Sequence, residues 1–152
     1  MFWGCISKHR TGRLRCIDGT MNAAKYKQVL EEDLIPEFNI AKETIDGDWK
    51  LMQDNAPCHT AHAVKAFLRE QQVEFIDWPP YSPDLNPIEN VWNWIKHKLE
   101  TEFQPMQSEE ELYNAVAELW GQITPEQCFA WAGNYEKRLQ AVLDAEGMHT
   151  KY

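Results

Sequence analysis

Apolar positions alternate between short runs and helically spaced stripes along the chain. Residues 2–7 and 14–17 are short, largely apolar runs, and the segment between them is polar and contains a glycine. This pattern predicts two strands joined as an antiparallel hairpin. A stripe at i, i+3, i+4 and i+8 then predicts a helix over residues 21–38, with its end marked by Pro36.

The middle of the chain alternates strand and helix patterns. Residues 49–54 predict a strand that ends on Asp54, and the sequence Asn-Ala-Pro after it breaks the strand. An apolar stripe predicts the next helix, and residues 73–78 predict another strand. Residues 79–87 hold four prolines in nine positions, which predicts a stiff loop.

The last part of the chain predicts helices. Asn86 and Pro87 are suited to the N-cap and first positions of a helix whose apolar face runs on to Leu99. Capping-box patterns predict two more helix starts, and apolar stripes follow both. The pattern residues are Ser108 with Glu111, Thr124 with Gln127, Leu112/Val116/Leu119 and Trp131/Tyr135/Leu139. The order β-β-α-β-α-β-α followed by two helices predicts an α/β fold with an antiparallel start.

Composition supports one folded domain within the 152 residues. Apolar residues make up 43% of the chain, and seven tryptophans are enough to fill a core. No apolar run approaches the roughly 20 residues that cross a bilayer, and the N-terminus lacks the order of a signal peptide. The four cysteines form no C-x-x-C pair, which favours free thiols in a reducing compartment.

Charge is unevenly distributed. The net charge of −9 argues against nucleic-acid binding by the chain as a whole, because phosphate binding depends on Lys and Arg. Residues 100–152 carry 10 acidic and 3 basic residues, whereas residues 1–99 carry 14 and 12. Any surface that meets DNA is therefore expected in the first hundred residues. Residues 8–15 hold four basic residues, which suit either a DNA backbone or an ordinary solvated turn.

Two acidic residues are candidates for chemistry. Asp54 ends a predicted strand, and Glu89 lies in the first turn of a predicted helix, positions at which α/β proteins build sites. Carboxylates that converge from different elements supply the hard oxygen ligands that Mg²⁺ prefers. Local roles explain both residues at least as well: Glu89 could complete a capping box with Asn86, and Asp54 suits a turn.

The pattern Cys58-His59-x-x-His62 resembles metal-ligand spacing but lacks a second ligand pair at the distance that a zinc site requires. The alternative is a loop that runs into the start of a helix. Asp54 and Glu89 therefore remain the stronger candidates.

Two long motifs closely resemble the second and third catalytic motifs of Tc/mariner DDE transposases. They are QDNAPCHTA at 53–61 and WPPYSPDLNPIENVW at 78–92, and 34 residues separate Asp54 from Glu89, as in the Tc-type branch of that family. WGCIS at 3–7 and IDGTMN at 17–22 resemble the family's second and third strands and the start of its first helix. The resemblance thus covers nearly the whole chain.

The resemblance implies a ribonuclease-H-like mixed sheet with C-terminal helices in a single domain, 1–152, with its ribonuclease-H-like portion over 1–104 and helices over 105–152. It implies that Asp54 and Glu89 are the second and third catalytic carboxylates and that both bind Mg²⁺ or Mn²⁺. The implied activity is cleavage and rejoining of DNA at transposon ends, that is, DNA transposition and integration in the nucleus.

We expect the family's first catalytic Asp and its upstream helix-turn-helix modules to be missing, and we expect Asp18 to be a poor substitute for that Asp. We therefore expect weakened metal binding and no transposition by the isolated chain. The first, central strand of the sheet is also expected to be absent. Residues 2–7 and 49–54 would then pair with each other or with another chain, with marginal stability or self-association as the result.

Two further interpretations compete with a catalytic fragment. A transposase-derived chain retained as a non-catalytic interaction module would use its acidic C-terminal helices to contact another protein. An unrelated acidic α/β protein would require both long motifs to be coincidental. An upstream reading frame that encodes a strand ending in Asp and a helix-turn-helix region would favour the catalytic fragment over the interaction module.

Overall fold

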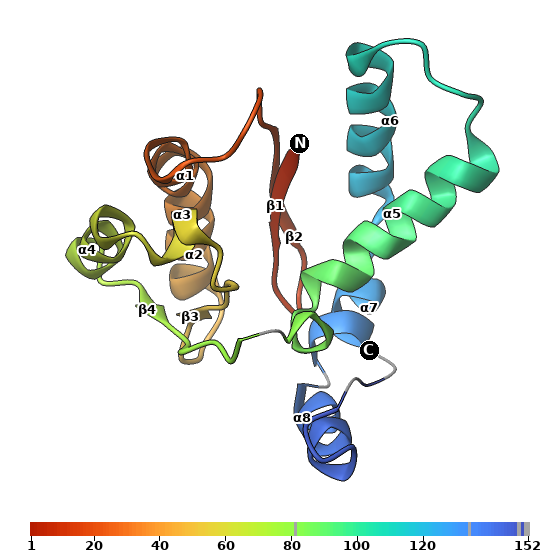
Figure 1. Ribbon diagram of the computed structural model, residues 1–152. Coiled ribbons are helices and arrows are strands. Elements are labelled where there is room, and N and C mark those ends of the chain that lie inside the picture. The colour runs from red at the N-terminus through yellow and green to blue at the C-terminus, as the bar shows by residue number, and fades with distance from the viewer. Residues whose placement is uncertain (81, 134, 149, 151–152) are drawn as a thin grey trace. The chain divides into compact units, whose positions relative to one another are not determined.

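The structure is a computed structural model that describes residues 1–80, 82–133, 135–148 and 150. The chain forms two compact units (Figure 1). The first unit contains Met1–Trp3 and Arg15–Ser82, and the second contains Gly4–Leu14 and residues 83–152. The N-terminal hairpin therefore contributes residues to both units.

Strands β1 (Phe2–Ile6) and β2 (Thr11–Cys16) form that hairpin, as predicted. The loop between them is shorter than expected, and β2 begins at Thr11 rather than at residue 14. The Ser7 backbone N–H donates to the Arg10 carbonyl at 2.9 Å. The Ser7 hydroxyl also accepts a bond from the Arg10 N–H at 3.2 Å. This local network closes a tight turn, so the polar residues after it join the ladder.

A long helical segment follows in the first unit: α1 (Ala23–Val29), the π-helical stretch η1 (Leu30–Leu34) and α2 (Ile35–Thr44). The prediction that this segment ends near Pro36 is wrong. Pro36 lies in the first turn of α2, directly after the π-helical stretch, whose changed hydrogen-bond pattern lets the helix continue through the proline. Burial of Phe38 and Ala41 then favours helix as far as Thr44.

The rest of the first unit is a small parallel sheet with two helices between its strands. Strand β3 (Lys50–Leu51) pairs with β4 (Glu74–Phe75), and the connection contains α3 (Pro57–Thr60) and α4 (His62–Glu70). Both strands are shorter than the predicted segments 49–54 and 73–78. Helix α1 contacts α3 and α4, so its buried face covers the segment that carries the DNAPCH sequence.

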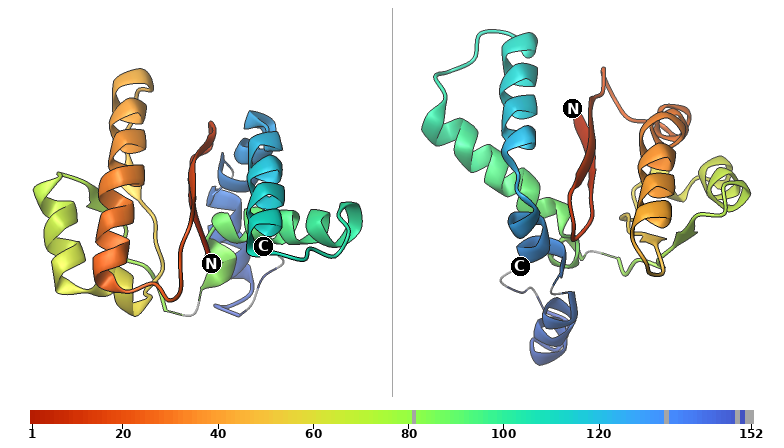
Figure 2. Two further views of the ribbon diagram at one scale, coloured as in Figure 1. Left: turned by 90° about the horizontal axis from the view of Figure 1, so that it is seen from above. Right: turned by 180° about the vertical axis from the view of Figure 1, so that it is seen from behind.

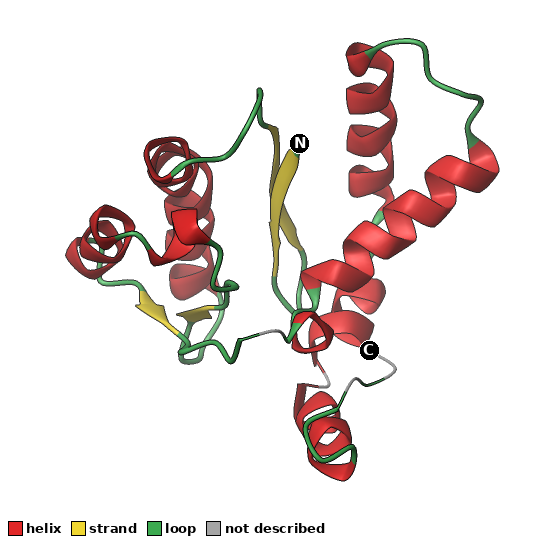
Figure 3. Ribbon diagram, viewed as in Figure 1, coloured by secondary structure: helices red, strands yellow, loops and turns green. Residues whose placement is uncertain are grey.

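The second unit is mainly helical (Figures 2 and 3). Its elements are η2 (Pro83–Leu85), α5 (Ile88–Glu102), α6 (Glu109–Gln122), α7 (Pro125–Cys128), the π-helical η3 (Phe129–Gly133) and α8 (Tyr135–Asp144). Helix α5 packs against α6, and the Trp92 and Trp120 rings stack with centroids 5.4 Å apart. The three helix starts lie close to the predicted positions, because their capping signals are local.

The capping predictions differ in outcome. Thr124 and Gln127 form a complete capping box. Ser108 caps α6 by accepting a bond from the Glu111 N–H at 3.1 Å, but the Glu111 carboxylate reaches the Gln107 N–H instead of closing the box. Each helix start is nevertheless confirmed.

The apolar stripe predicted to end at Leu139 is wrong, because Leu139 is 43% exposed while Arg138 is buried. The guanidinium of Arg138 has polar partners inside the unit, which a pattern based on apolarity does not detect.

The described strands form two separate two-stranded sheets, β1–β2 and β3–β4. The expectation that residues 2–7 and 49–54 pair with each other is therefore wrong for the described part of the chain. No described helix is long and apolar enough to cross a membrane.

Candidate functional site

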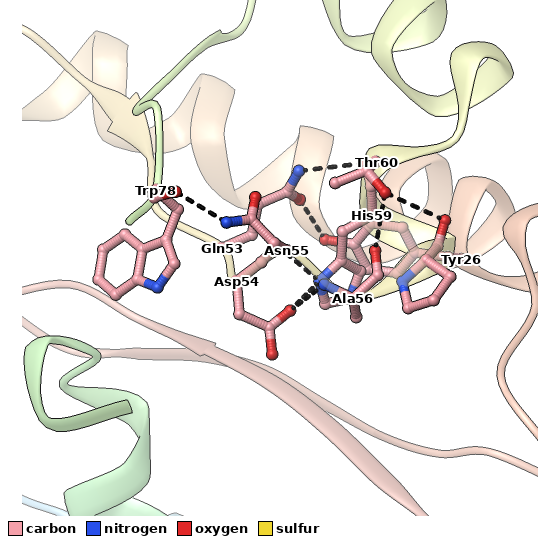
Figure 4. Close-up of polar contacts among 9 residues, drawn as sticks. Tyr26, Gln53, Asp54, Asn55, Ala56, His59, Thr60 and Trp78 are labelled. Carbon is pink, nitrogen blue, oxygen red and sulfur yellow. Dashed lines mark hydrogen bonds and ion pairs between the residues drawn. The ribbon is translucent and has the colours of Figure 1, made fainter. Parts of the chain in front are cut away.

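Asp54 lies three residues after the end of β3, in a turn that its own side chain stabilises. The Oδ1 atom of Asp54 accepts a hydrogen bond from the Ala56 N–H at 2.9 Å. The same oxygen lies 2.6 Å from Nδ1 of His59 (Figure 4). Asp54 can therefore form this turn and still offer a carboxylate oxygen to a ligand, because both contacts use the same oxygen, Oδ1.

His59 is itself held by the first unit. Its ring packs against Tyr26 of α1, with ring centroids 4.2 Å apart. The Tyr26 hydroxyl donates to Oε1 of Gln53 at 2.6 Å. Asn55 extends the network by donating from Nδ2 to the Trp78 carbonyl at 2.7 Å, which joins the segments that follow β3 and β4. Helix α1 and both strand ends therefore support the Asp54 turn.

Solvent reaches Asp54 but little of His59. The Asp54 side chain is 55% exposed and the His59 side chain 19% exposed. Figure 4 shows the second carboxylate oxygen of Asp54 directed away from the labelled cluster. A hard cation would find an accessible oxygen on an anchored carboxylate here, which fits the donor chemistry of Mg²⁺ or Mn²⁺.

Glu89 lies in the first turn of α5 and is exposed. Its backbone N–H donates to the Asn86 carbonyl at 3.1 Å. The Asn86 side chain accepts a bond from the Ile88 N–H at 3.4 Å, but the N-cap of α5 is Pro87, so the helix begins one residue later than predicted and Asn86 lies just before its cap. Glu89 therefore lies in the first turn of a helix whose start is stabilised by local hydrogen bonds.

The turn before α5 is tied to the C-terminal part of the second unit. Arg138 donates from Nη1 to the Asp84 carbonyl at 2.8 Å and from Nη2 to the Trp131 carbonyl at 2.9 Å. Its Nη2 also bonds Oδ1 of Asn90. The Asp84 carboxylate accepts bonds from the Thr150 N–H at 3.2 Å and from its hydroxyl at 2.9 Å. These contacts hold both sides of the Glu89 turn.

Asp54 belongs to the first unit and Glu89 to the second. Their convergence on one ion, and the division of a single domain at residues 104 and 105, stay predictions. Within the described ranges, no three His, Cys, Asp or Glu side chains form a cluster that could hold a metal ion. Sequence reasoning considered His59 only as a zinc ligand; the structure instead places its Nδ1 against Asp54.

The chain belongs to the family described as DDE superfamily endonuclease, whose match covers residues 2–113. The Tcb2 transposase of Caenorhabditis briggsae is 32% identical over 152 residues, and the Tc1 transposase of Caenorhabditis elegans is 31% identical over the same length. Each alignment covers all of this chain but 54% of the relative, so the chain spans about half the length of these proteins. The predicted resemblance to Tc/mariner transposases is confirmed.

Solved structures show the same fold. The catalytic domain of Mos1 transposase, in a structure with Raltegravir and Mg, matches 99% of this chain and 76% of its own length with a TM-score of 0.86 and 22% identity. The Mos1 mariner paired-end complex with Mn matches 99% of this chain and 44% of its own length with a TM-score of 0.87. The predicted ribonuclease-H-like α/β fold is thereby confirmed.

Proposed function

We propose that this chain is part of the catalytic domain of a DDE transposase, in which Asp54 and Glu89 are metal-binding carboxylates for DNA strand cleavage and transfer. The observation that carries the proposal is the geometry of Asp54. Its carboxylate is anchored through one oxygen and exposed on the other side, within the DNAPCH segment that resembles the family's second catalytic motif.

Mg²⁺ or Mn²⁺ is the proposed cofactor. Carboxylate oxygens are the ligands that these hard cations favour, and Mos1 catalytic-domain structures with Mg and with Mn support this choice. When bound, such ions neutralise charge on a phosphate and help generate a nucleophile from water. Asp54 and Glu89 contribute the negative charge and the orientation of their oxygens.

DNA is the proposed partner, specifically a transposon end. The Mos1 paired-end complex with the left transposon end supports this for a protein of the same fold. Residues 1–99, with 14 acidic and 12 basic residues, are closer to neutral than the rest of the chain and therefore repel phosphate less. Action on genomic DNA implies residence in the nucleus.

A second candidate is a non-catalytic interaction module. Exposed apolar side chains in and just beyond α8 favour it, since Leu143 is 71% and Met148 73% exposed. Acidic residues of the same region, such as Glu136 and Asp144, would complement a basic partner. This function does not require Asp54 or Glu89, so it predicts no effect of their substitution on partner binding.

The test is Mn²⁺ binding by the purified chain, measured by calorimetry. We expect Asp54→Asn and Glu89→Gln each to weaken binding about tenfold or more, since each removes a charged ligand. Asp77→Asn and Glu100→Gln are matched controls, because both carboxylates are exposed and lie outside the two motif positions. Equal binding by all five proteins would overturn the metal-dependent function.

A further inference from the structure

The contact between His59 and Asp54 gives the histidine a role beyond its place in the motif. We propose that His59 is a positioning residue that fixes the orientation of the Asp54 carboxylate and leaves one oxygen available to the metal ion. The inference rests on the proposed function, because it assumes that Asp54 is a ligand.

The hydrogen-bond geometry defines the direction of this interaction. Nδ1 of His59 lies 2.6 Å from Oδ1 of Asp54. An ionised carboxylate only accepts hydrogen bonds, so Nδ1 carries the proton and donates it. The Ala56 N–H donates to the same oxygen at 2.9 Å. Two donors on Oδ1 fix the rotation of the carboxyl group. The other oxygen, Oδ2, then points away from this cluster, toward solvent (Figure 4).

Two contacts hold the His59 imidazole in the orientation that faces Asp54. The His59 backbone N–H donates to the Ala56 carbonyl at 2.9 Å, which sets the start of α3. The imidazole packs on the Tyr26 ring, with the two ring centroids 4.2 Å apart. Tyr26 is itself 2% exposed, and its hydroxyl is hydrogen-bonded to Gln53. The donor is therefore pre-oriented by a buried aromatic residue, whereas the carboxylate that it holds is 55% exposed.

An anchored ligand binds a metal ion better than a freely rotating one, because less conformational freedom is lost on binding. Hydrogen-bond partners of a metal-binding carboxylate typically change affinity by about 10–100-fold when they are removed. A role limited to closing the turn would instead change stability without a specific effect on the ion.

The first measurement needs no metal. Nitrogen-15 NMR of the imidazole at pH 8 reports which ring nitrogen carries the proton, and His59→Leu identifies the signals. We expect the Nδ1–H tautomer in the unsubstituted chain and its loss in Asp54→Ala. An Nε2–H tautomer in the unsubstituted chain, or the same tautomer in both proteins, overturns the inference and leaves the proposed function intact.

The second measurement compares His59→Asn with His59→Leu in Mn²⁺ titrations. The two side chains have the same branching and both remove the ring that packs on Tyr26, but the asparagine amide retains an N–H at the place of Nδ1. We expect His59→Leu to bind Mn²⁺ about tenfold more weakly than His59→Asn. Melting temperatures of both variants check that each is folded.

The outcomes separate the two proposals. If Asp54→Asn weakens binding but the two His59 variants bind equally, the positioning role is wrong and the metal site remains. If Asp54→Asn binds Mn²⁺ as the unsubstituted chain does, the proposed function fails, and the positioning of a ligand fails with it.

Discussion

Arg138 illustrates how much of this structure depends on single polar residues. It is 3% exposed and donates to two backbone carbonyls and to Asn90. Its guanidinium joins the turn before α5 to the segment around Trp131. The residue therefore stabilises the element that carries Glu89, although it lies almost fifty residues away along the chain.

Replacement of Arg138 is expected to destabilise the second unit strongly. Arg138→Met leaves carbonyl and amide oxygens without a donor, and we expect the free energy of unfolding to fall by about 3 kcal/mol. Urea denaturation followed by tryptophan fluorescence measures the loss. Lys137→Met is the matched control, because Lys137 is exposed and should change stability by less than about 0.5 kcal/mol. Similar midpoints for the two variants would refute this role of Arg138.

Both strands of the N-terminal hairpin contact Trp120 of α6 within the second unit. The Trp120 indole N–H donates to the Gly12 carbonyl at 2.9 Å. A Cβ at Gly4 would lie 2.4 Å from the Trp120 ring. Gly4 is therefore required by close packing of the strand on the indole rather than by its backbone conformation.

Gly4→Ala is expected to lower stability by about 1–3 kcal/mol, because the added methyl group displaces the indole. Gly121→Ala is the control, since no atom lies within 4 Å of its added Cβ and alanine is favoured over glycine within a helix, here in the last turn of α6. The control should raise the melting temperature slightly while Gly4→Ala lowers it. A rise in melting temperature for both variants would show that the strand can move away from Trp120 at little cost.

The elements also show what sequence patterns can and cannot predict. The capping signals at Ser108 and Thr124 predicted helix starts, because they act within one turn. Pro36 wrongly predicted the end of a helix, since the π-helical turn that accommodates the proline has no local sequence signal. The strands at Lys50 and Glu74 were predicted too long, because a ladder requires a partner strand that the local pattern does not specify.

The same distinction applies to the site. Asp54 and Glu89 were predicted from their motifs, and their local environments agree with exposed carboxylates. The interaction of His59 with Asp54 was missed, because it depends on how a turn folds back over five residues and on Tyr26 of a distant helix. Burial of Arg138 was missed for the same reason: two of its acceptors, at Asp84 and Asn90, are distant in sequence.

The two small sheets of the described chain favour association between copies of this chain. A two-stranded sheet is marginally stable alone, and strand edges invite pairing with another chain. We propose that the chain self-associates through such edges as its concentration rises. Light scattering coupled to size-exclusion chromatography at several concentrations measures the mass. A monomer at every concentration with a sharp, high-temperature melt would contradict this proposal.

We propose that Asp54 and Glu89 hold the same metal ion, and a double-mutant cycle of Mn²⁺ affinity tests this central proposal most directly. The proteins are the unsubstituted chain, Asp54→Asn, Glu89→Gln and the double variant. If both carboxylates hold one site, either substitution removes most of the binding and the second adds little, so the combined loss is smaller than the sum of the single losses. Losses that add fully would place the two residues at independent sites and contradict the account.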